Sequence, residues 1–166
     1  METPKYKRAT VVKSNNDFIF IQTYSGFFNF LPDPEGKKFF LDQAVSDNDL
    51  GCAITESVLA CRQVDPNSDP DFFHVRGRVI PQYEDWVSEV MAKYGYKNRK
   101  LMFKNMNSCY VDMVGEGFLI MKPSYHEKIE AWSGKGITEA DYVKVPFPAP
   151  PENIGAALRV CISRCK

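Results

Sequence analysis

The chain lacks an excess of charge of either sign, and this excludes several kinds of partner. Lysine and arginine together number 21 among its 166 residues, as do aspartate and glutamate. A whole-protein attraction to phosphate backbones or anionic lipids is therefore absent, and a nucleic-acid role would need a local basic patch. Long apolar runs are also missing, since FIFI and GFLIM are far too short to span a bilayer. No secretory signal follows the start METPKYKRAT, so we expect a cytoplasmic protein that makes no membrane contact.

Histidine and cysteine are too few, and too unfavourably spaced, for a metal site. The chain has two histidines and five cysteines, without a C-x-x-C, His-x-His or Cys-x-x-His spacing. Cys161 and Cys165 are one helical turn apart, but two further ligands of a suitable type are not near them. We therefore expect no metal and no cofactor. The cysteines are interpreted as small buried hydrophobes that stay reduced in a reducing compartment.

Catalytic motifs are missing as well. No serine stands in a G-x-S-x-G turn, and no cysteine has the signature of a nucleophile. The stretch HEKIE lacks the second histidine of a zinc-protease helix, and Ser124 with Glu127 instead predicts a capping box for a short helical turn. His74, His126 and Lys128 have the chemistry of a metal-independent nuclease, but nothing in the sequence brings the two histidines together. A binding module is therefore expected rather than an enzyme.

What the sequence does contain is a repeat. SDNDLGCAITESVLACR, residues 46–62, returns as PPENIGAALRVCISRCK, residues 150–166, with every residue 104 positions after its counterpart. The apolar residues of each copy recur at a spacing that places them on one face of a helix. These residues are Leu50, Ile54 and Val58 in the first copy, and Ile154, Leu158 and Ile162 in the second. The alignment continues backwards through KKFFL and DYVKV, which predicts that a strand–loop–helix unit occurs twice.

The start of each repeated helix carries further signals. Ser46, followed by Asp49 three residues later, resembles a capping box. Gly51 aligns with Gly155, and a glycine at this position would let the first helical turn approach a strand closely. A phosphate cradle is the alternative interpretation of the paired glycines, but neither G-x-x-x-x-G-K-[ST] nor G-x-G-x-x-G accompanies them. Packing is the favoured interpretation.

The remaining elements predict the fold class. YEDWVSEVMAKYG, residues 83–95, is the clearest helix, with Pro81 before it and Gly95 at its C-terminal end. Its apolar face consists of Tyr83, Trp86, Val87, Val90, Met91 and Tyr94. Strands are predicted for RATVVK, NDFIFIQTY, KLMFK, SCYVDMV and GFLIMK, and the turn GEG joins the last two into a hairpin. We expect a single domain, residues 1–166, of the α/β (α+β) class. It should combine a mixed β-sheet with about three main helices, in pseudo-repeat halves of about residues 8–64 and 79–166.

One segment has the composition of a nucleic-acid site. In YGYKNRKLMFK, residues 94–104, basic residues alternate with aromatic ones, a pattern that suits a single strand whose bases stack on the rings. A helix C-terminus also favours positive charge, and lysine often protects a strand edge, so a structural interpretation of this segment is favoured. Binding of RNA or single-stranded nucleic acid through this segment is therefore kept as an alternative function.

Several stretches together resemble the cytoplasmic immunity proteins of contact-dependent growth inhibition systems. The matching pieces occur in the expected order and cover most of the chain, but residues 63–79 do not fit the family pattern. These pieces are NDFIFIQTYSGFFNFLPDPEGKKFFL, SDNDLGCAI, YGYKNRKLMFKNMNSCYV, HEKIEAWSGKGI and PPENIGAALRVCISRC.

The resemblance implies a non-enzymatic inhibitor. Such a protein would bind the toxic C-terminal domain of a large exported effector, with one immunity protein per toxin, and would mask its active site or substrate surface. The toxins are commonly nucleases that attack tRNA or DNA, and an RNA-cleaving toxin, with tRNA as a candidate substrate, is the one we expect here. No catalytic residues are carried over, and direct nucleic-acid binding is not expected on this interpretation.

Two stretches have a composition suited to an electropositive nuclease site, because carboxylates speed the encounter and aromatic anchors add affinity. One is the loop that unites Asp65, Asp69 and Asp71 with Phe72 and its neighbour Phe73. The other is YHEKIEAW, which offers Tyr125, Glu127, Glu130 and Trp132. The aspartates could instead only solvate a loop while the phenylalanines begin a core strand. We predict that these residues contact the toxin.

Overall fold

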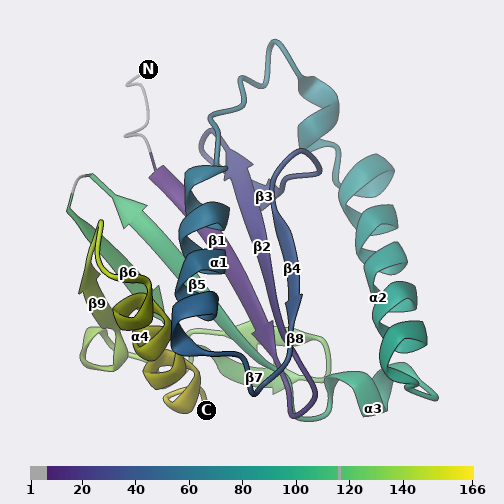
Figure 1. Ribbon diagram of the computed structural model, residues 1–166. Coiled ribbons are helices and arrows are strands. Elements are labelled where there is room, and N and C mark those ends of the chain that lie inside the picture. The colour runs from purple at the N-terminus through teal and green to yellow at the C-terminus, as the bar shows by residue number, and fades with distance from the viewer. Residues whose placement is uncertain (1–6, 116) are drawn as a thin grey trace.

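The computed structural model describes residues 7–115 and 117–166, which form a twisted seven-stranded main sheet, a separate two-stranded sheet, and helices packed around them (Figure 1). The elements of the first part of the chain are β1 (Lys7–Ser14), β2 (Ile19–Gly26), β3 (Phe30–Pro32), β4 (Lys38–Leu41), α1 (Asp47–Leu59), the short helices η1 (Pro70–Phe73) and η2 (Val75–Val79), and α2 (Ile80–Tyr94). The elements of the second part are α3 (Arg99–Phe103), β5 (Asn107–Val114), β6 (Phe118–Lys122), β7 (Tyr125–Lys128), β8 (Ala131–Ser133), η3 (Glu139–Asp141), β9 (Val143–Pro146) and α4 (Pro151–Ser163).

The main sheet has the order β3-β2-β1-β5-β6-β9. Strand β4 also pairs with β2, along residues 19–22, whereas the short β3 pairs with residues 24–26 of the same strand. The ladders between these strands are antiparallel, and a parallel pairing occurs only as the isolated bridge between Gly26 and Gln63 among the described residues. The domain is therefore of the α+β class. The hairpin predicted at residues 115–117 is confirmed by the pairing of β5 with β6, although Glu116 itself lies outside the described residues.

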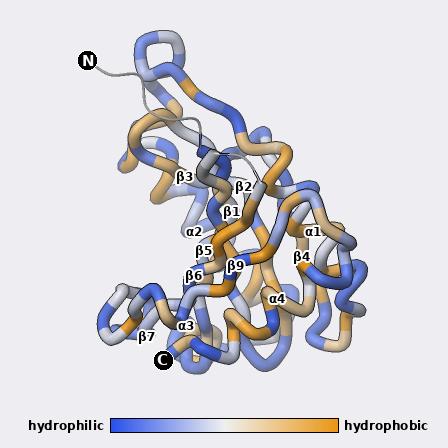
Figure 2. The backbone as a smooth tube through the Cα atoms, turned by 90° about the vertical axis from the view of Figure 1, so that its left-hand side faces the viewer, coloured by the Kyte–Doolittle hydropathy of each residue, from blue (hydrophilic) through white to orange (hydrophobic). Residues whose placement is uncertain are grey.

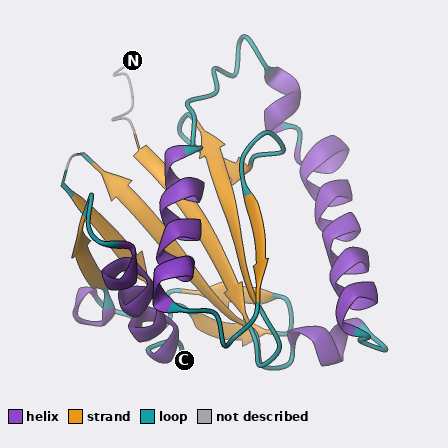
Figure 3. Cartoon of the chain, in the orientation of Figure 1, coloured by secondary structure: helices purple, strands orange, loops and turns teal. Residues whose placement is uncertain are grey.

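One face of the sheet is covered by α1 and α4, which lie side by side in front of it (Figures 1 and 3). Because side chains alternate along a strand, every second residue of the central strands points into this layer. Figure 2 shows the resulting apolar stretches along β2, β5 and β9. The fully buried residues of this core include Val12, Ile19, Ile21, Leu50, Ile54, Val58, Val111, Leu119, Met121, Ile154 and Leu158. The helical prediction for the repeat is confirmed, since both predicted faces contribute to this core.

The paired glycines form the contact between α1 and α4. A Cβ atom on Gly51 would overlap the carbonyl oxygen of Pro151 and lie 2.9 Å from its Cα. A Cβ atom on Gly155 would meet the carbonyl oxygen of Asp47 in the same way, again 2.9 Å from the Cα. The glycines thus allow two helices to touch, and the predicted approach of a helix to a strand was wrong. The contact is reciprocal because Asp47 and Pro151 are themselves counterparts in the repeat.

The strand–loop–helix unit is present twice, since β4 leads into α1 and β9 leads into α4. These two strands lie at opposite edges of the sheet, and their helices meet in the middle. Ser46 caps α1 as predicted, because its hydroxyl accepts a hydrogen bond from the backbone N–H of Asp49 at 3.0 Å. The boundaries of the halves, about residues 8–64 and 79–166, stay a proposal.

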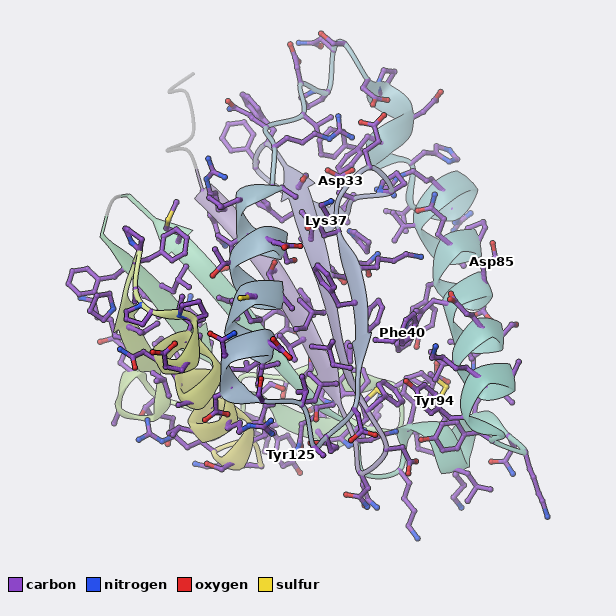
Figure 4. All side chains as sticks on the ribbon, viewed as in Figure 1. Asp33, Lys37, Phe40, Asp85, Tyr94 and Tyr125 are labelled. Atoms are coloured by element: carbon purple, nitrogen blue, oxygen red, sulfur yellow. The ribbon has the colours of Figure 1, made fainter. Side chains whose placement is uncertain are left out.

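The opposite face of the sheet is covered only in part. α2 stands beside the sheet next to β4, and Figure 4 shows Phe40 between them. The whole predicted apolar face of α2 packs in a second cluster with Phe18, Phe20 and Phe103. α2 ends at Gly95, whose φ of 72° is the left-handed conformation expected of a C-terminal glycine cap. The part of the sheet that this cluster leaves uncovered forms the site described below.

Two local predictions were wrong. KLMFK lies mostly in the helix α3 rather than in a strand, because the Asn98 side chain accepts a hydrogen bond from the N–H of Leu101 at 2.9 Å and caps it. Ser124 does not begin a helical turn, since its hydroxyl donates to the carbonyl of Ser108 at 2.6 Å and the following residues form β7. In both places a tertiary contact or a cap decided between local alternatives.

Candidate interaction surface

A hollow of about 560 Å³ lies between the uncovered face of the sheet and α2. The strands β1, β2, β4 and β5 line one wall, α2 lines the opposite wall, and the hairpin of β7 and β8 contributes Glu130, Ala131 and Trp132. The principal lining residues are Val11, Lys13, Gln22, Tyr24, Lys38, Tyr83, Asp85, Trp86, Glu89, Tyr110 and Trp132. The hollow therefore combines aromatic rings with charges of both signs.

Strand alternation explains why these residues face the hollow. In β1, Val12 points into the core under α1, so its neighbours Val11 and Lys13 point to the other side. On α2, Gln82, Asp85 and Glu89 recur at helical spacing, directly beside the apolar face that holds the helix to the sheet. Each wall thus presents the polar positions of an amphipathic element.

A network of charged groups joins the β7–β8 turn to α2. Glu130 accepts hydrogen bonds from Arg99 at 2.6 Å and 3.0 Å and from the Tyr83 hydroxyl at 2.6 Å. Arg99 also binds Glu84 on α2 at 2.5 Å. The hydrogen bonds from Arg99 lower the pKa of Glu130, and burial together with Glu130 raises the pKa of Tyr83. The network fixes the position of the turn at one end of the hollow.

Charges of opposite sign stand on opposite walls. Lys13 and Lys38 come from the strands, whereas Asp85 and Glu89 come from α2. Among the residues that the structure describes, none of these four takes part in an ion pair. The walls do not neutralise each other, so both remain available to an occupant.

A second, smaller hollow of about 280 Å³ continues along the same face and shares Val11, Tyr24 and Tyr110 with the first. Its charges are satisfied within the chain, because Asp112 pairs with Lys7 at 3.4 Å and with Lys122 at 3.2 Å. The larger hollow is therefore the stronger candidate for binding.

The predicted acidic loop lies at the top of the molecule in Figure 1, between α1 and α2. The side chain of Asp65 accepts from the N–H of Asn67 at 2.8 Å, and that of Asp69 accepts from the N–H of Phe72 at 3.2 Å. Phe72 is only 2% exposed and lies beneath the guanidinium group of Arg78, 4.4 Å from its ring centroid. Its ring holds the loop together rather than facing a partner.

Asp71 is exposed, and hydrogen bonds of its side chain are absent from the described part of the chain. Phe73 is half-buried, and its ring packs edge-to-face on that of Phe72 with the centroids 5.0 Å apart. Of the predicted loop, Asp65 and Asp71 are thus the side chains most open to a partner.

The residues of the second predicted stretch, YHEKIEAW, lie partly in the hollow and partly outside it. Glu130 and Trp132 line the hollow, whereas Glu127 is exposed on β7 and Tyr125 is half-buried with Lys135 5.6 Å from its ring centroid. Figure 4 places Tyr125 at the lower end of the sheet. The residues that sequence reasoning missed are mainly those of the strand and α2 walls.

The aromatic rings of the basic–aromatic segment are half-buried or buried, and each is engaged within the chain. Tyr94 stacks on Phe18 with centroids 4.7 Å apart, and Phe103 is completely buried. The Tyr96 hydroxyl is hydrogen-bonded to Asp17, and Arg99 belongs to the network above. Base stacking needs exposed rings. The alternative of nucleic-acid binding through residues 94–104 therefore lacks its structural basis.

The two histidines have structural partners at opposite ends of the molecule. His74 accepts a hydrogen bond from the N–H of Gly77 at 2.7 Å, next to the N-terminal end of α2. His126 lies on β7, where its ring stacks on Trp132 with centroids 5.0 Å apart and bonds to the carbonyl of Ile129 at 2.8 Å. The structure therefore does not assemble the acid–base set of His74, His126 and Lys128.

Residues 7–115 and 117–166 contain neither a metal site nor a membrane-spanning helix. No group of three or more histidine, cysteine, aspartate or glutamate side chains there is arranged to hold a metal ion. None of the helices in that part has the length and apolar character needed to cross a membrane.

Comparison with known proteins identifies the relatives of this chain. Residues 7–165 match the family model described as CdiI, CDI immunity protein. The immunity protein CdiI-YPIII of Yersinia pseudotuberculosis serotype O:3 is 35% identical over 167 residues, covering 93% of each chain.

Two solved structures have the same fold. One is the CdiA-CT/CdiI toxin and immunity complex from Yersinia pseudotuberculosis, with a TM-score of 0.89 and 32% identity over 97% of this chain and 98% of that one. The other is a protein of unknown function from Neisseria meningitidis, with a TM-score of 0.87 and 32% identity over 100% and 99% of the two chains.

Proposed function

Because this chain belongs to the CdiI family of contact-dependent growth inhibition (CDI) immunity proteins, we propose that it binds and neutralises the C-terminal toxin domain of a CDI effector. The complex of a CdiA-CT toxin with an immunity protein of the same fold supports this proposal. The protein acts as a stoichiometric inhibitor, with one molecule per toxin, and performs no reaction of its own. It acts in the cytoplasm, and its five free cysteines suit a reducing compartment.

The proposed docking site for the toxin is the hollow between the sheet and α2, and the residues that line this hollow are the observation that supports it. Tyr24, Trp86, Tyr110 and Trp132 give it the rigid aromatic surface that anchors many interfaces. The unpaired charges on its two walls add the electrostatic complementarity that selects one partner and speeds its encounter. A toxin segment that enters the hollow would bury these groups together and bring the rest of the toxin against the rim.

The charge pattern favours a protein segment over a nucleic acid as the occupant. A phosphodiester backbone carries only negative charge, and Asp85, Glu89 and Glu130 would repel it at the same time as Lys13 and Lys38 attract it. A polypeptide can match both walls because it can present acidic and basic side chains on different sides. We therefore place the toxin itself, rather than its substrate, in the hollow.

We propose further that the toxin is a nuclease that cleaves RNA, with tRNA as a candidate substrate, and that binding covers its active site or substrate surface. A nuclease site must be electropositive to hold phosphates and stabilise their developing charge. The carboxylates of the α2 wall suit such a surface. Asp65, Asp71, Tyr125 and Glu127 remain proposed as outer contacts, since their exposure allows a large toxin to reach them.

The direct test is co-expression with the toxin domain encoded next to the immunity gene. The toxin alone should arrest growth, and the parent protein should restore growth and co-purify with the toxin in a 1:1 complex by light scattering. A variant with Asp85→Lys and Glu89→Lys should protect poorly, whereas Glu56→Lys, on the exposed side of α1, should protect like the parent. Growth arrest that the parent protein cannot relieve would refute the function. Full protection by the charge-reversed variant would move the docking site away from the hollow.

A further inference from the structure

Lys13 is a cation in an unusual setting at the base of the hollow. It comes from the middle of the sheet, is only partly exposed, and its ammonium nitrogen lies 3.5 Å from the centroid of the Trp132 ring. An ion pair to Lys13 is absent from the part of the chain that the structure describes. The ring offers a weak electrostatic partner, but it does not supply the anion that a partly buried cation normally has.

The carboxylates nearest to this end of the hollow do not serve as that anion. Glu130 is already held by two groups, Arg99 and Tyr83. Asp85 and Glu89 stand on the α2 wall and make no ion pair with Lys13. Elsewhere on the same face the chain does pair its lysines, since Lys7 and Lys122 both bind Asp112. The missing partner of Lys13 is therefore a property of this site.

We propose that Lys13 is a receptor for an acidic side chain of the bound toxin, an aspartate or glutamate whose carboxylate enters the hollow and pairs with the ammonium group beside Trp132. This inference rests on the proposed function, because it assigns one contact within the proposed docking site. Trp132 would flank the incoming carboxylate and keep water from the pair, which makes the charge interaction stronger than at an open surface.

A carboxylate fits this position better than a phosphate group. The free carboxylates of Asp85 and Glu89 face the same space, and a nucleic-acid strand, which carries a negative charge on every phosphate and no positive charge, would be repelled by both. A single carboxylate on an otherwise mixed-charge segment meets one cation at the base of the hollow, while basic residues of that segment can turn toward α2. The site therefore selects for a particular pattern of charges in the toxin.

Binding of a carboxylate predicts an exchange of protons with the solvent. Burial lowers the pKa of Lys13 to about 7 in the free protein. Pairing with a carboxylate favours the charged form and raises this pKa, so the complex binds more protons than its free components above pH 7. The affinity should accordingly fall as the pH rises from about 7 toward the pKa of the complex.

Other titratable groups also surround Lys13. The titratable or charged groups that line the hollow with it are Tyr24, Lys38, Tyr83, Asp85, Glu89, Tyr110 and Glu130. Cys109 acts on it electrostatically from the core on the other side of the sheet, and His126 stacks on Trp132, the ring that Lys13 also contacts. Burial raises the pKa of Tyr24 and Tyr83, neighbouring thiols raise that of Cys109, and Arg99 lowers that of Glu130. All four shifts move titration away from neutral pH. His126 requires a variant of its own.

The experiment is isothermal titration calorimetry of the adjacent-gene toxin domain, catalytically inactivated, against the full-length protein at pH 6 and pH 8. Buffers of different ionisation enthalpy report the number of protons taken up. The parent should take up roughly one proton more at pH 8 than Lys13→Met does, and Lys13→Met should bind about 10- to 100-fold more weakly. Lys37→Met removes the same charge from an exposed position outside the hollow, and should behave like the parent.

The outcomes separate this inference from the function it rests on. Tight binding by Lys13→Met with unchanged proton uptake overturns the carboxylate site and leaves the proposed function standing. Loss of the uptake in His126→Asn but not in Lys13→Met assigns the proton to the histidine and also overturns it. Binding of a single-stranded RNA oligonucleotide that Lys13→Met abolishes would identify a phosphate site instead. Failure of the parent to bind the toxin at all refutes the function itself. Melting curves of each variant control for folding.

Discussion

Replacing Gly51 or Gly155 with alanine sets two physical effects against each other. Both residues lie inside helices, where alanine is intrinsically favoured over glycine by about 1 kcal/mol. On helix propensity alone, each substitution should stabilise the protein. The contact between α1 and α4 predicts the opposite, because the added methyl group would meet backbone atoms of the partner helix rather than a flexible side chain.

The magnitude follows from what must move. A Cβ atom on Gly155 would lie 2.9 Å from the Cα of Asp47, well inside ordinary van der Waals contact. The helices have to separate or slide, which loosens the packing around Ile54, Ile154 and Leu158. Overpacking of this kind typically costs about 1–3 kcal/mol and outweighs the gain in propensity. For a domain of this size, each kcal/mol shifts the melting temperature by about 2–4 °C.

Thermal and urea unfolding of the two variants measure the sign directly. Gly134→Ala is the matched control, because nothing lies within 4 Å of the place that its added methyl group would take, and its change should stay within about 0.5 kcal/mol. The double variant should cost less than the sum of the single ones, since one separation of the helices relieves both clashes. If both single variants melt above the parent, helix propensity dominates and the packing account of the repeat fails.

Three further predictions concern the surface loop, a buried ion pair and the thiols. Replacing Asp65 and Asp71 with serine should slow toxin association at low salt and flatten its salt dependence without changing the melting temperature, and identical kinetics at both salts would remove the loop from the interface. Burial opposes ionisation of Asp33, but hydrogen bonds from Arg62 and Ser25 outweigh it and lower its pKa. Asp33→Asn should therefore cost about 1–3 kcal/mol at pH 7, and urea unfolding should show this difference shrinking as the pH falls through the lowered pKa of the parent, whereas a pH-independent difference would contradict it. Thiol titration in denaturant should find five reactive cysteines, and in the native protein Cys165 should react early because a hydrogen bond from Cys109 lowers its pKa to about 7; a stoichiometric metal or a native disulfide would overturn this expectation.

Local patterns in the chain were sufficient for most of the core. The spacing of Leu50, Ile54 and Val58, repeated in the second copy, identified the buried faces of α1 and α4 because a helix returns to the same face about every four residues. The apolar runs of β1, β2, β5 and β6 were equally informative. These predictions succeeded because burial on a regular element leaves a periodic trace in the sequence.

Predictions that depended on a choice between local alternatives were less secure. The run KLMFK contains enough apolar residues for a strand, but the Asn98 cap and the burial of Met102 and Phe103 make it a helix. Ser124 stands three residues before a glutamate, as in a capping box, yet its hydroxyl bonds to β5 and the residues after it pair with β8. The local signal was real in each case, but a helix cap together with burial outweighed it in the first case, and a distant partner outweighed it in the second.

By itself the sequence determined the class of fold, the two repeated helices with their close-packed glycines and the resemblance to an immunity protein family, because each of these is recorded in spacing or in order along the chain. It did not reveal the hollow, or that the glycines touch a helix. In the sequence, Lys13 is one more polar residue of a strand, and Asp85 and Glu89 belong to the solvated side of a helix. Only the tertiary structure showed that α2 leaves part of the sheet uncovered, so that these residues face one another across a common space. Which charges share a site depends on the packing of elements distant in sequence, and periodicity within one element carries no information about it.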